Sequence, residues 1–267
     1  MRPRTSPAPA SSATAAIRFK VLAALALLCA CKAQEEPSAR AQHLSVGACE
    51  ERRFEGSAFT LCKYDSAKHR IEFFVEGKQG RPLRSFEALD AHLGPRVSGL
   101  LFAMNAGMYG KEGRPIGLYV EDGRQIRAIN LKQGGGNFHL MPNGVFAVDA
   151  RGRPSVTPSK QFRIREPRWA TQSGPMLVIE GKLHPAFAPN GESLHIRNGV
   201  GVCGPTTAWF AISDEPVSFG RFARLFKDEL GCTDALFLDG AVSSLWEPGA
   251  RQDVRAPLGP IVAVFRR

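Results

Sequence analysis

The chain has 267 residues, with 35 Lys+Arg against 25 Asp+Glu, six Cys, 27 Gly and 19 Pro, and 43% of its residues are hydrophobic. This composition excludes a disordered chain, a collagen-like repeat and a disulfide-dense miniprotein. A chain of this length can bury a large core without depending on metals or disulfides. The formal net charge of +10 is typical of proteins that bind nucleic acid or membranes, so the position of the charges matters.

Residues 1–30 have the parts of a signal peptide. An apolar run at 21–30 follows four basic residues and no acidic ones: Arg2, Arg4, Arg18 and Lys20. About ten apolar residues are too few to cross a hydrocarbon core of about 30 Å as a helix. The pattern therefore predicts export and cleavage.

The sequence Leu-Cys-Ala-Cys at 28–31 resembles the lipobox of bacterial lipoproteins, and Cys31 is the expected lipidation site. Ordinary cleavage nearby, which would release a soluble secreted protein, is the alternative. Residues 31–48 are polar without periodicity, which predicts a disordered tether to a folded domain at 49–267. We therefore expect an exported protein of the bacterial cell envelope or periplasm, attached to the membrane by a lipid anchor.

Much of the basic character belongs to the export segment. Its removal takes four basic residues from 35 and leaves 31 Lys+Arg against 25 Asp+Glu, a net charge of +6. No run of five or more basic residues remains, and no basic helix has interleaved aromatic residues. We expect no nucleic-acid partner. The remaining surplus favours an anionic substrate.

Four cysteines remain after Cys29 leaves and Cys31 is lipidated, and an even number in an exported protein predicts two disulfides. Three connectivities are possible, and proximity in the sequence favours Cys49–Cys62 and Cys203–Cys232. A zinc site is the alternative. It is disfavoured because none of the four forms a Cys-x2-Cys pair.

Short strands dominate the middle of the chain. Segments with the length and composition of β-strands occur at 71–75, 100–104, 117–120, 138–141, 145–148 and 176–179. The pairs Asp122-Gly123, Asn143-Gly144 and Glu180-Gly181 are typical of hairpin turns. This region is therefore predicted to be antiparallel.

Two segments have helical periodicity. Ser85 can cap a helix that ends at Gly94, and Ser218 can cap a second one that ends at Gly231. The second helix lies between strands expected at 207–212 and 235–238, an order that favours a parallel pair.

A last strand is expected at 261–265, and residues 49–75 are expected to form a small hairpin appendage. The predicted fold is a single mixed α/β (α+β) domain with a mixed, largely antiparallel sheet and a few flanking helices.

The candidate chemistry lies at the ends of expected strands. The sequence has no Gly-x-Ser-x-Gly, P-loop, His-Glu-x-x-His or strand-linked Gly-x-Gly-x-x-Gly motif. Polar residues whose side chains could take part in catalysis or binding instead lie at the beginning or just after the end of expected strands: Asn105, Ser173, His195, Arg197 and Asp239. Taken singly, such residues are more often turn, exposed or structural residues than catalytic ones.

Their order along the chain adds information. Six segments, at 102–109, 115–119, 136–144, 171–177, 196–201 and 235–244, together resemble the phosphodiester glycosidase family, which includes the eukaryotic mannose-6-phosphate uncovering enzyme. The resemblance covers about residues 98–266. It implies a mixed α/β domain that hydrolyses a sugar-1-phosphodiester, with a glycan phosphodiester or cell-envelope polymer as substrate. We expect no cofactor and no metal.

The resemblance also implies an active site. Asp239 is expected to act as base or nucleophile at the anomeric carbon, Arg197 to clamp the phosphate, and His195 to assist proton transfer. The leaving group is a phosphate monoester, so one carboxylate can suffice. Substrate contacts are expected from Asn105, Gly107, Ser173, Gly174, Asn198, Gly240 and Ser243.

The chain departs from the family pattern where Ala106 and the pair Ala241-Val242 replace glycines. Glycine allows a positive φ and close approach to a ligand, so these methyl groups are expected to narrow the pocket or to alter the backbone geometry.

Two other functions fit the residues. A metal-dependent phosphodiesterase could use Asp239 as a metal ligand. It would differ from a phosphodiester glycosidase in losing activity in EDTA and in the product that takes up oxygen from labelled water. A non-catalytic envelope lipoprotein that binds glycans or anionic polymers would release no reducing sugar.

Overall fold

The computed structural model describes residues 48–267 except 78–79, 164–165 and 254–256. These residues fall within one compact unit, Leu44–Arg267. The expected signal peptide, Cys31 and all but the last residue of the expected tether lie outside the described residues. No helix in the described part is long and apolar enough to cross a membrane.

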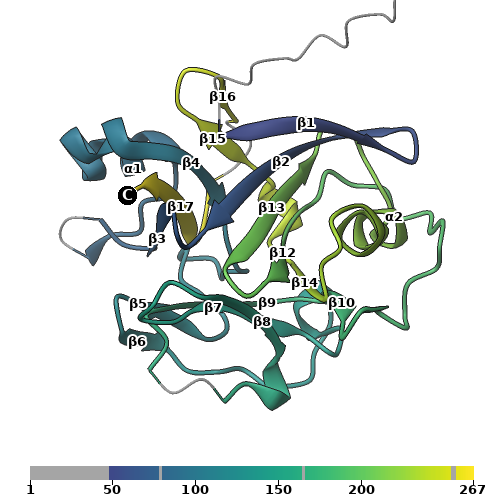
Figure 1. Cartoon of the computed structure of the whole chain (residues 1–267). Helices are drawn as coiled ribbons and strands as arrows, with labels where there is room; N and C mark the ends of the chain where they lie inside the picture. Colours follow the sequence, from purple (N-terminus) through teal and green to yellow (C-terminus); the bar gives the residue numbers. More distant parts are fainter. Residues whose placement is uncertain (1–47, 78–79, 164–165, 254–256) are drawn as a thin grey trace, which may run out of the picture. The chain divides into compact units, whose positions relative to one another are not determined.

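Three antiparallel sheets form the framework (Figure 1). The seven-stranded sheet has the order β1-β2-β13-β12-β14-β10-β11. Its strands are β1 Cys49–Phe54, β2 Ser57–Asp65, β13 Thr207–Ser213, β12 Asn198–Gly204, β14 Asp234–Phe237, β10 Met176–Ile179 and β11 Lys182–Leu183.

Two five-stranded sheets complete the framework. One has the order β16-β15-β4-β17-β3, with β16 Arg251–Gln252, β15 Leu245–Glu247, β4 Leu100–Asn105, β17 Ile261–Arg266 and β3 His69–Phe74. The other has the order β6-β5-β9-β7-β8, with β6 Arg124–Arg127, β5 Tyr119–Glu121, β9 Trp169–Ser173, β7 Gly144–Val148 and β8 Pro154–Pro158.

All three sheets contribute to one central core. Phe210 of the seven-stranded sheet contacts Phe102 of β4 and Phe146 of β7, with ring centroids 5.5 and 5.6 Å apart. All three side chains are buried. Because each sheet buries one face here, the ends of strands from different sheets come close together, and that is where the candidate residues lie.

The two helices cover other sheet faces. Helix α1, Phe86–Leu93, packs against the five-stranded sheet that contains β4 and β17, and α2, Phe219–Arg224, packs against the seven-stranded sheet (Figure 1). Both begin at the predicted caps, since Ser85 Oγ accepts from the Ala88 N–H and Ser218 Oγ from the Arg221 N–H. After α2 the chain continues in a π-helical turn, Leu225–Glu229.

The predominantly antiparallel, single-domain prediction is confirmed, and three details are wrong. Strands β13 and β14 do not pair, because β12 lies between them and is antiparallel to both. Residues 49–75 are no appendage, because β2 pairs with β13 and β3 pairs with β17. Because the fold consists mainly of three antiparallel sheets with two short helices, the α/β label applies only loosely.

The third detail concerns the segment around Phe138. Residues 137–139 form a 3-10 turn that buries Phe138, and Asn143 is a buried residue before β7, with no tight hairpin turn there. The segment at 138–141 is therefore a loop in which Phe138 alone is buried.

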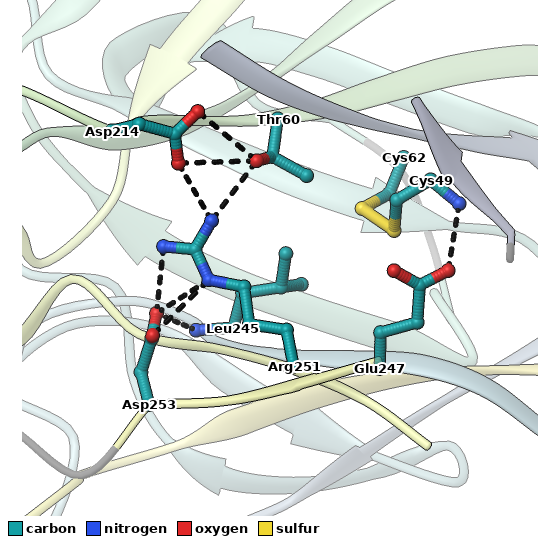
Figure 2. Close-up of a disulfide and its surroundings, with 8 residues drawn as sticks. All are labelled: Cys49, Thr60, Cys62, Asp214, Leu245, Glu247, Arg251 and Asp253. Atoms are coloured by element: carbon teal, nitrogen blue, oxygen red, sulfur yellow. Dashed lines mark hydrogen bonds and ion pairs between the residues drawn. A yellow bond between two sulfur atoms is a disulfide. The ribbon is translucent and has the colours of Figure 1, made fainter. Parts of the chain in front are cut away.

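Both predicted disulfides are present, Cys49–Cys62 and Cys203–Cys232. Figure 2 shows that Glu247 of β15 lies beside the first, where its Oε1 accepts the Cys49 N–H at 3.0 Å. In the same view Arg251 joins Asp253 to Asp214 by ion pairs of 3.0 and 2.6 Å. These contacts connect the β15–β16 hairpin to the seven-stranded sheet.

Candidate functional site

The candidate residues meet where strands of different sheets end. Asn105 is the last residue of β4, Ser173 the last of β9 and Asn198 the first of β12, while Asp239 follows β14 by two residues. The Asp239 N–H donates to the Ala106 carbonyl at 3.1 Å, and Asn105 Nδ2 donates to the Asp239 carbonyl at 2.8 Å. The segment after β14 is therefore held directly against the end of β4.

Buried amides and hydroxyls form a network beneath Asp239. Asn198 Nδ2 donates to Asn105 Oδ1 at 2.9 Å, and Ser243 Oγ donates to Asn198 Oδ1 at 3.1 Å. Asn105 Oδ1 also accepts the Ser244 N–H at 2.8 Å. Each of the four side chains is at most 1% exposed. Asn105, Asn198 and Ser243 thus form one connected unit.

The Asp239 carboxylate is only partly exposed, and its Oδ1 accepts the Ala241 N–H at 3.2 Å. Burial disfavours the charged form and raises the pKa of Asp239 to about 6. At pH 7 the group is still mainly a carboxylate. It can therefore accept a proton or attack an electrophilic carbon at neutral pH.

Gly107 and Gly174 lie in close contact with neighbouring segments. A Cβ at Gly107 would lie 2.3 Å from Thr171 Oγ1 and 2.5 Å from the Gln172 carbonyl, and one at Gly174 would lie 2.6 Å from Asn143 Cβ. Both glycines therefore allow close packing of the chain. Between these segments Ser173 is fully buried, and its Oγ has no hydrogen-bond partner among the described residues.

Arg197 is buried with two of its donors occupied. Nε donates to the Val217 carbonyl and Nη2 to the Ser193 carbonyl, both at 2.8 Å. The guanidinium carbon lies 3.5 Å from the centroid of the Phe219 ring. The side-on pair of N–H groups is thus used internally, which leaves Nη1 without a hydrogen-bond partner among the described residues.

His195 and Gly240 lie at the margin of this arrangement. His195 is exposed, and its backbone pairs with Val217. A Cβ at Gly240 would lie 2.3 Å from the Phe237 ring, so this glycine allows the segment after Asp239 to pass over that ring. Among the described residues, no three His, Cys, Asp or Glu side chains gather in a way that could hold a metal ion.

Comparison with known proteins identifies the family. A family model described as phosphodiester glycosidase matches residues 98–259, more than half of the chain, and this range includes every candidate residue of the site. The chain belongs to the phosphodiester glycosidase family. Members of this family are glycosidases by description, which supports hydrolase activity.

Similar proteins extend over most of the chain. The Escherichia coli (strain K12) protein YigE, described as uncharacterized, is 34% identical over 200 residues, which cover 74% of this chain and 78% of YigE. The solved catalytic domain of zebrafish N-acetylglucosamine-1-phosphodiester alpha-N-acetylglucosaminidase, auto-inhibited by its pro-peptide, aligns with a TM-score of 0.55 and 13% identity. That alignment covers 82% of this chain and 81% of the zebrafish chain. It shows a shared fold.

Two residues near the site were missed from the sequence. Burial raises the pKa of Tyr109, and the Asp239 charge raises it further. Tyr109 ends the first family segment, so its position there was the available signal. Phe219, whose ring lies against the Arg197 guanidinium, has the helical spacing of a buried face, so the sequence by itself indicates only a core residue.

Most of the residues that replace the family's glycines in this chain do not narrow a pocket, because they lie in the interior. The Ala106 side chain lies in the central core, and Val242 packs in the apolar cluster that includes Phe86 and Trp246. Only Ala241 of the three is exposed. Two of the three methyl groups therefore fill the interior instead of narrowing a pocket.

Proposed function

We propose that this protein is an exported hydrolase that cleaves a sugar-1-phosphodiester at the glycosidic carbon. One observation carries the proposal: within the range matched by the family model, the backbone of Asp239 is held by hydrogen bonds to Asn105 and Ala106, and its carboxylate stays partly exposed. The shared fold with the zebrafish N-acetylglucosamine-1-phosphodiester alpha-N-acetylglucosaminidase suggests an N-acetylglucosamine-1-phosphodiester as the first substrate to test.

In the proposed mechanism Asp239 acts as base or nucleophile at the anomeric carbon. The bond between that carbon and the phosphate oxygen breaks, water supplies the new hydroxyl of the sugar, and the phosphate leaves as a monoester. This leaving group needs little help from a general acid, so one carboxylate is enough. The Ala241 N–H, donated to Oδ1, orients the carboxylate.

Arg197 is proposed to bind the phosphate through its end-on N–H pair, on Nη1 and Nη2. The Ser173 hydroxyl and the Gly174 N–H would donate hydrogen bonds to substrate oxygens. The network of Asn105, Asn198 and Ser243 keeps Asp239 in place, so we now assign these residues a positioning role. His195, exposed at the margin, would exchange protons between solvent and the departing phosphate.

The deciding experiment screens sugar-1-phosphodiesters for released reducing sugar, first with a methyl ester of N-acetyl-α-glucosamine 1-phosphate. Asp239→Asn should abolish turnover, Arg197→Lys should mainly raise KM, and Asp90→Asn on the exposed face of α1 should leave both kinetic constants unchanged. In oxygen-18 water the label should appear in the sugar. Label in the phosphate, or full activity of Asp239→Asn, would reject the mechanism.

Export and lipidation are part of the proposal. The two disulfides support an oxidising compartment outside the cytosol. The signal-like residues 1–30 and the lipobox-like sequence at 28–31 support attachment through Cys31. Mass spectrometry of the mature protein from a membrane fraction should find a diacylglyceryl group on Cys31, and Cys31→Ser should release the protein. An unmodified N-terminus at another residue would reject lipidation.

A further inference from the structure

Arg197 has an unusual environment for a charged side chain. It is 1% exposed, and it is the only Lys or Arg among the side chains that are buried in the described part of the chain. Buried cations are normally paired with an acidic group. Burial lowers the pKa of Arg197 to about 10, and no acidic side chain among the described residues opposes this shift. The fold therefore holds a desolvated positive charge without an acidic partner.

An aromatic ring takes the place of that acidic partner. The guanidinium carbon lies 3.5 Å from the Phe219 ring centroid and 5.5 Å from that of Phe237. A ring face attracts a cation, most strongly where water is excluded, and the planar guanidinium group stacks well on it. The carbonyls of Val217 and Ser193 fix the orientation of the guanidinium within its plane.

The Phe219 ring is itself held firmly. Phe187 stacks on it with centroids 4.9 Å apart and an interplanar angle of 8°, and Phe237 meets it edge-on at 4.8 Å. His184 stacks on Phe187 at 4.7 Å and is anchored by a contact of 3.1 Å from Nε2 to the Met141 carbonyl. Since Phe187 and Arg197 both lie close to the ring centre, they occupy its opposite faces.

We propose that Phe219 is a positioning residue for anion binding: its ring holds the Arg197 guanidinium so that the end-on N–H pair faces the phosphate of the substrate. This inference rests on the proposed role of Arg197. A side chain without a π face at position 219 would leave the buried guanidinium free to turn about its two carbonyl contacts. Phosphate binding would then weaken, while the chemistry at Asp239 would stay intact.

The experiment measures binding of inorganic phosphate to the full protein by calorimetry. Phe219→Met keeps most of the volume and loses the π face, and we expect about tenfold weaker binding. Phe219→Tyr keeps the ring and should bind as the wild type does. Phe222→Leu is the matched control, because Phe222 lies in the same helix and packs on Phe226 and Phe59, whereas the rings at the Arg197 guanidinium are Phe219 and Phe237. It should leave phosphate binding unchanged.

A second measurement needs no substitution. In the wild-type protein, ring current from Phe219 should shift the Arg197 Nε–H proton resonance upfield, and titration with phosphate should move that resonance. A resonance that saturating phosphate leaves unmoved would overturn the inference even if Phe219→Met failed to fold. Wild-type affinity in a folded Phe219→Met protein would overturn it as well.

These results are separable from the proposed function. Absence of sugar-1-phosphodiester turnover, together with phosphate binding that depends on Phe219, would reject the proposed reaction and keep the anion site. When substrate is turned over, the effect of Phe219→Met should fall on KM more than on kcat. A purely structural role would instead lower the fraction of active protein, so that kcat fell and KM did not change.

Discussion

The side chain of Asn198 donates two hydrogen bonds to Asn105, one to Oδ1 at 2.9 Å and one to the backbone carbonyl at 3.0 Å, across 93 positions of sequence. The pair joins the end of β4 to the start of β12 and so connects two sheets. Asn105 also binds the Asp239 carbonyl. The position of the proposed catalytic carboxylate therefore depends on a buried amide pair.

Replacing Asn198 should be costly. Asn198→Ala removes both donors to Asn105 and leaves Ser243 Oγ without its Asn198 acceptor, so several buried polar groups lose partners together. We expect a loss of about 2–4 kcal/mol in the free energy of unfolding, measured with urea. Asn190→Ala, at an exposed loop position, should change it by less than about 0.5 kcal/mol. Equal effects of the two substitutions would contradict a structural role for the amide pair.

Asp239 should make the protein less stable at neutral pH than in mild acid. Its pKa is about 6 in the folded protein against 3.8 as the ordinary value, so the stability it contributes below pH 4 is lost as pH rises through 6. Asp239→Asn stays neutral and keeps an oxygen for the Ala241 N–H. It should be about 2–3 kcal/mol more stable than wild type at pH 7.5, with little difference at pH 3.5. A difference that does not depend on pH would contradict this assignment.

The same group should govern the acid side of the activity profile. A phosphodiester stays a monoanion from pH 4 to 8, so a fall in kcat/KM over this range reports a group on the protein. We expect kcat/KM to be level above about pH 7 and to fall about tenfold per unit below pH 6. Carbon-13 NMR of the Asp239 carboxyl, assigned by its absence in Asp239→Asn, should titrate at the same pH. If the carboxyl titrates near the ordinary pKa of an aspartate, a group other than Asp239 causes the fall in kcat/KM at low pH.

Local signals in the sequence predicted local structure well. The caps at Ser85 and Ser218, and the left-handed glycines Gly94 and Gly231 after the two helical segments, follow from side-chain chemistry within one turn. The same reasoning failed for β13 and β14. Whether two strands that flank a helix are neighbours depends on what else enters the sheet, and β12 enters between them.

The candidate site was predictable in part. Ordered family motifs indicated Asn105, Asn198 and Asp239, but the face of each side chain depends on the tertiary packing. Phe219 has the spacing of an ordinary core residue, and only the structure shows that its ring also contacts a buried cation. His195 shares an alternating pattern with Arg197, yet one is exposed and the other buried, because the strand begins only at Asn198.

The Cys203–Cys232 disulfide should stabilise the protein mainly by restricting the unfolded chain. The two cysteines are 29 positions apart, and closing a loop of this size contributes about 3–4 kcal/mol in the chain-entropy model. The double variant Cys203→Ala and Cys232→Ala should lose that amount in urea unfolding. The double variant Cys49→Ala and Cys62→Ala, with a separation of 13, should lose about 3 kcal/mol. A negligible loss in both would point to residual structure in the unfolded state.

Ser173 offers a test in which stability and activity should move in opposite directions. Its hydroxyl is fully buried and has no partner among the described residues. A buried polar group without a hydrogen bond costs about 1–3 kcal/mol, so Ser173→Ala should unfold at the same urea concentration as wild type or at a higher one. If the hydroxyl serves a substrate oxygen as proposed, kcat/KM should fall by about tenfold or more.

Ser155→Ala is the matched control. Ser155 lies on β8, away from the proposed site, and its Oγ donates to the Ala147 carbonyl at 3.3 Å. That substitution should lower stability slightly, by at most about 1 kcal/mol, and leave kcat/KM unchanged. A Ser173→Ala protein that is destabilised would mean that the hydroxyl has a structural partner in solution. A Ser173→Ala protein with full activity would mean that Ser173 does not bind the substrate. The phosphate would then be bound by Arg197 and the Gly174 N–H.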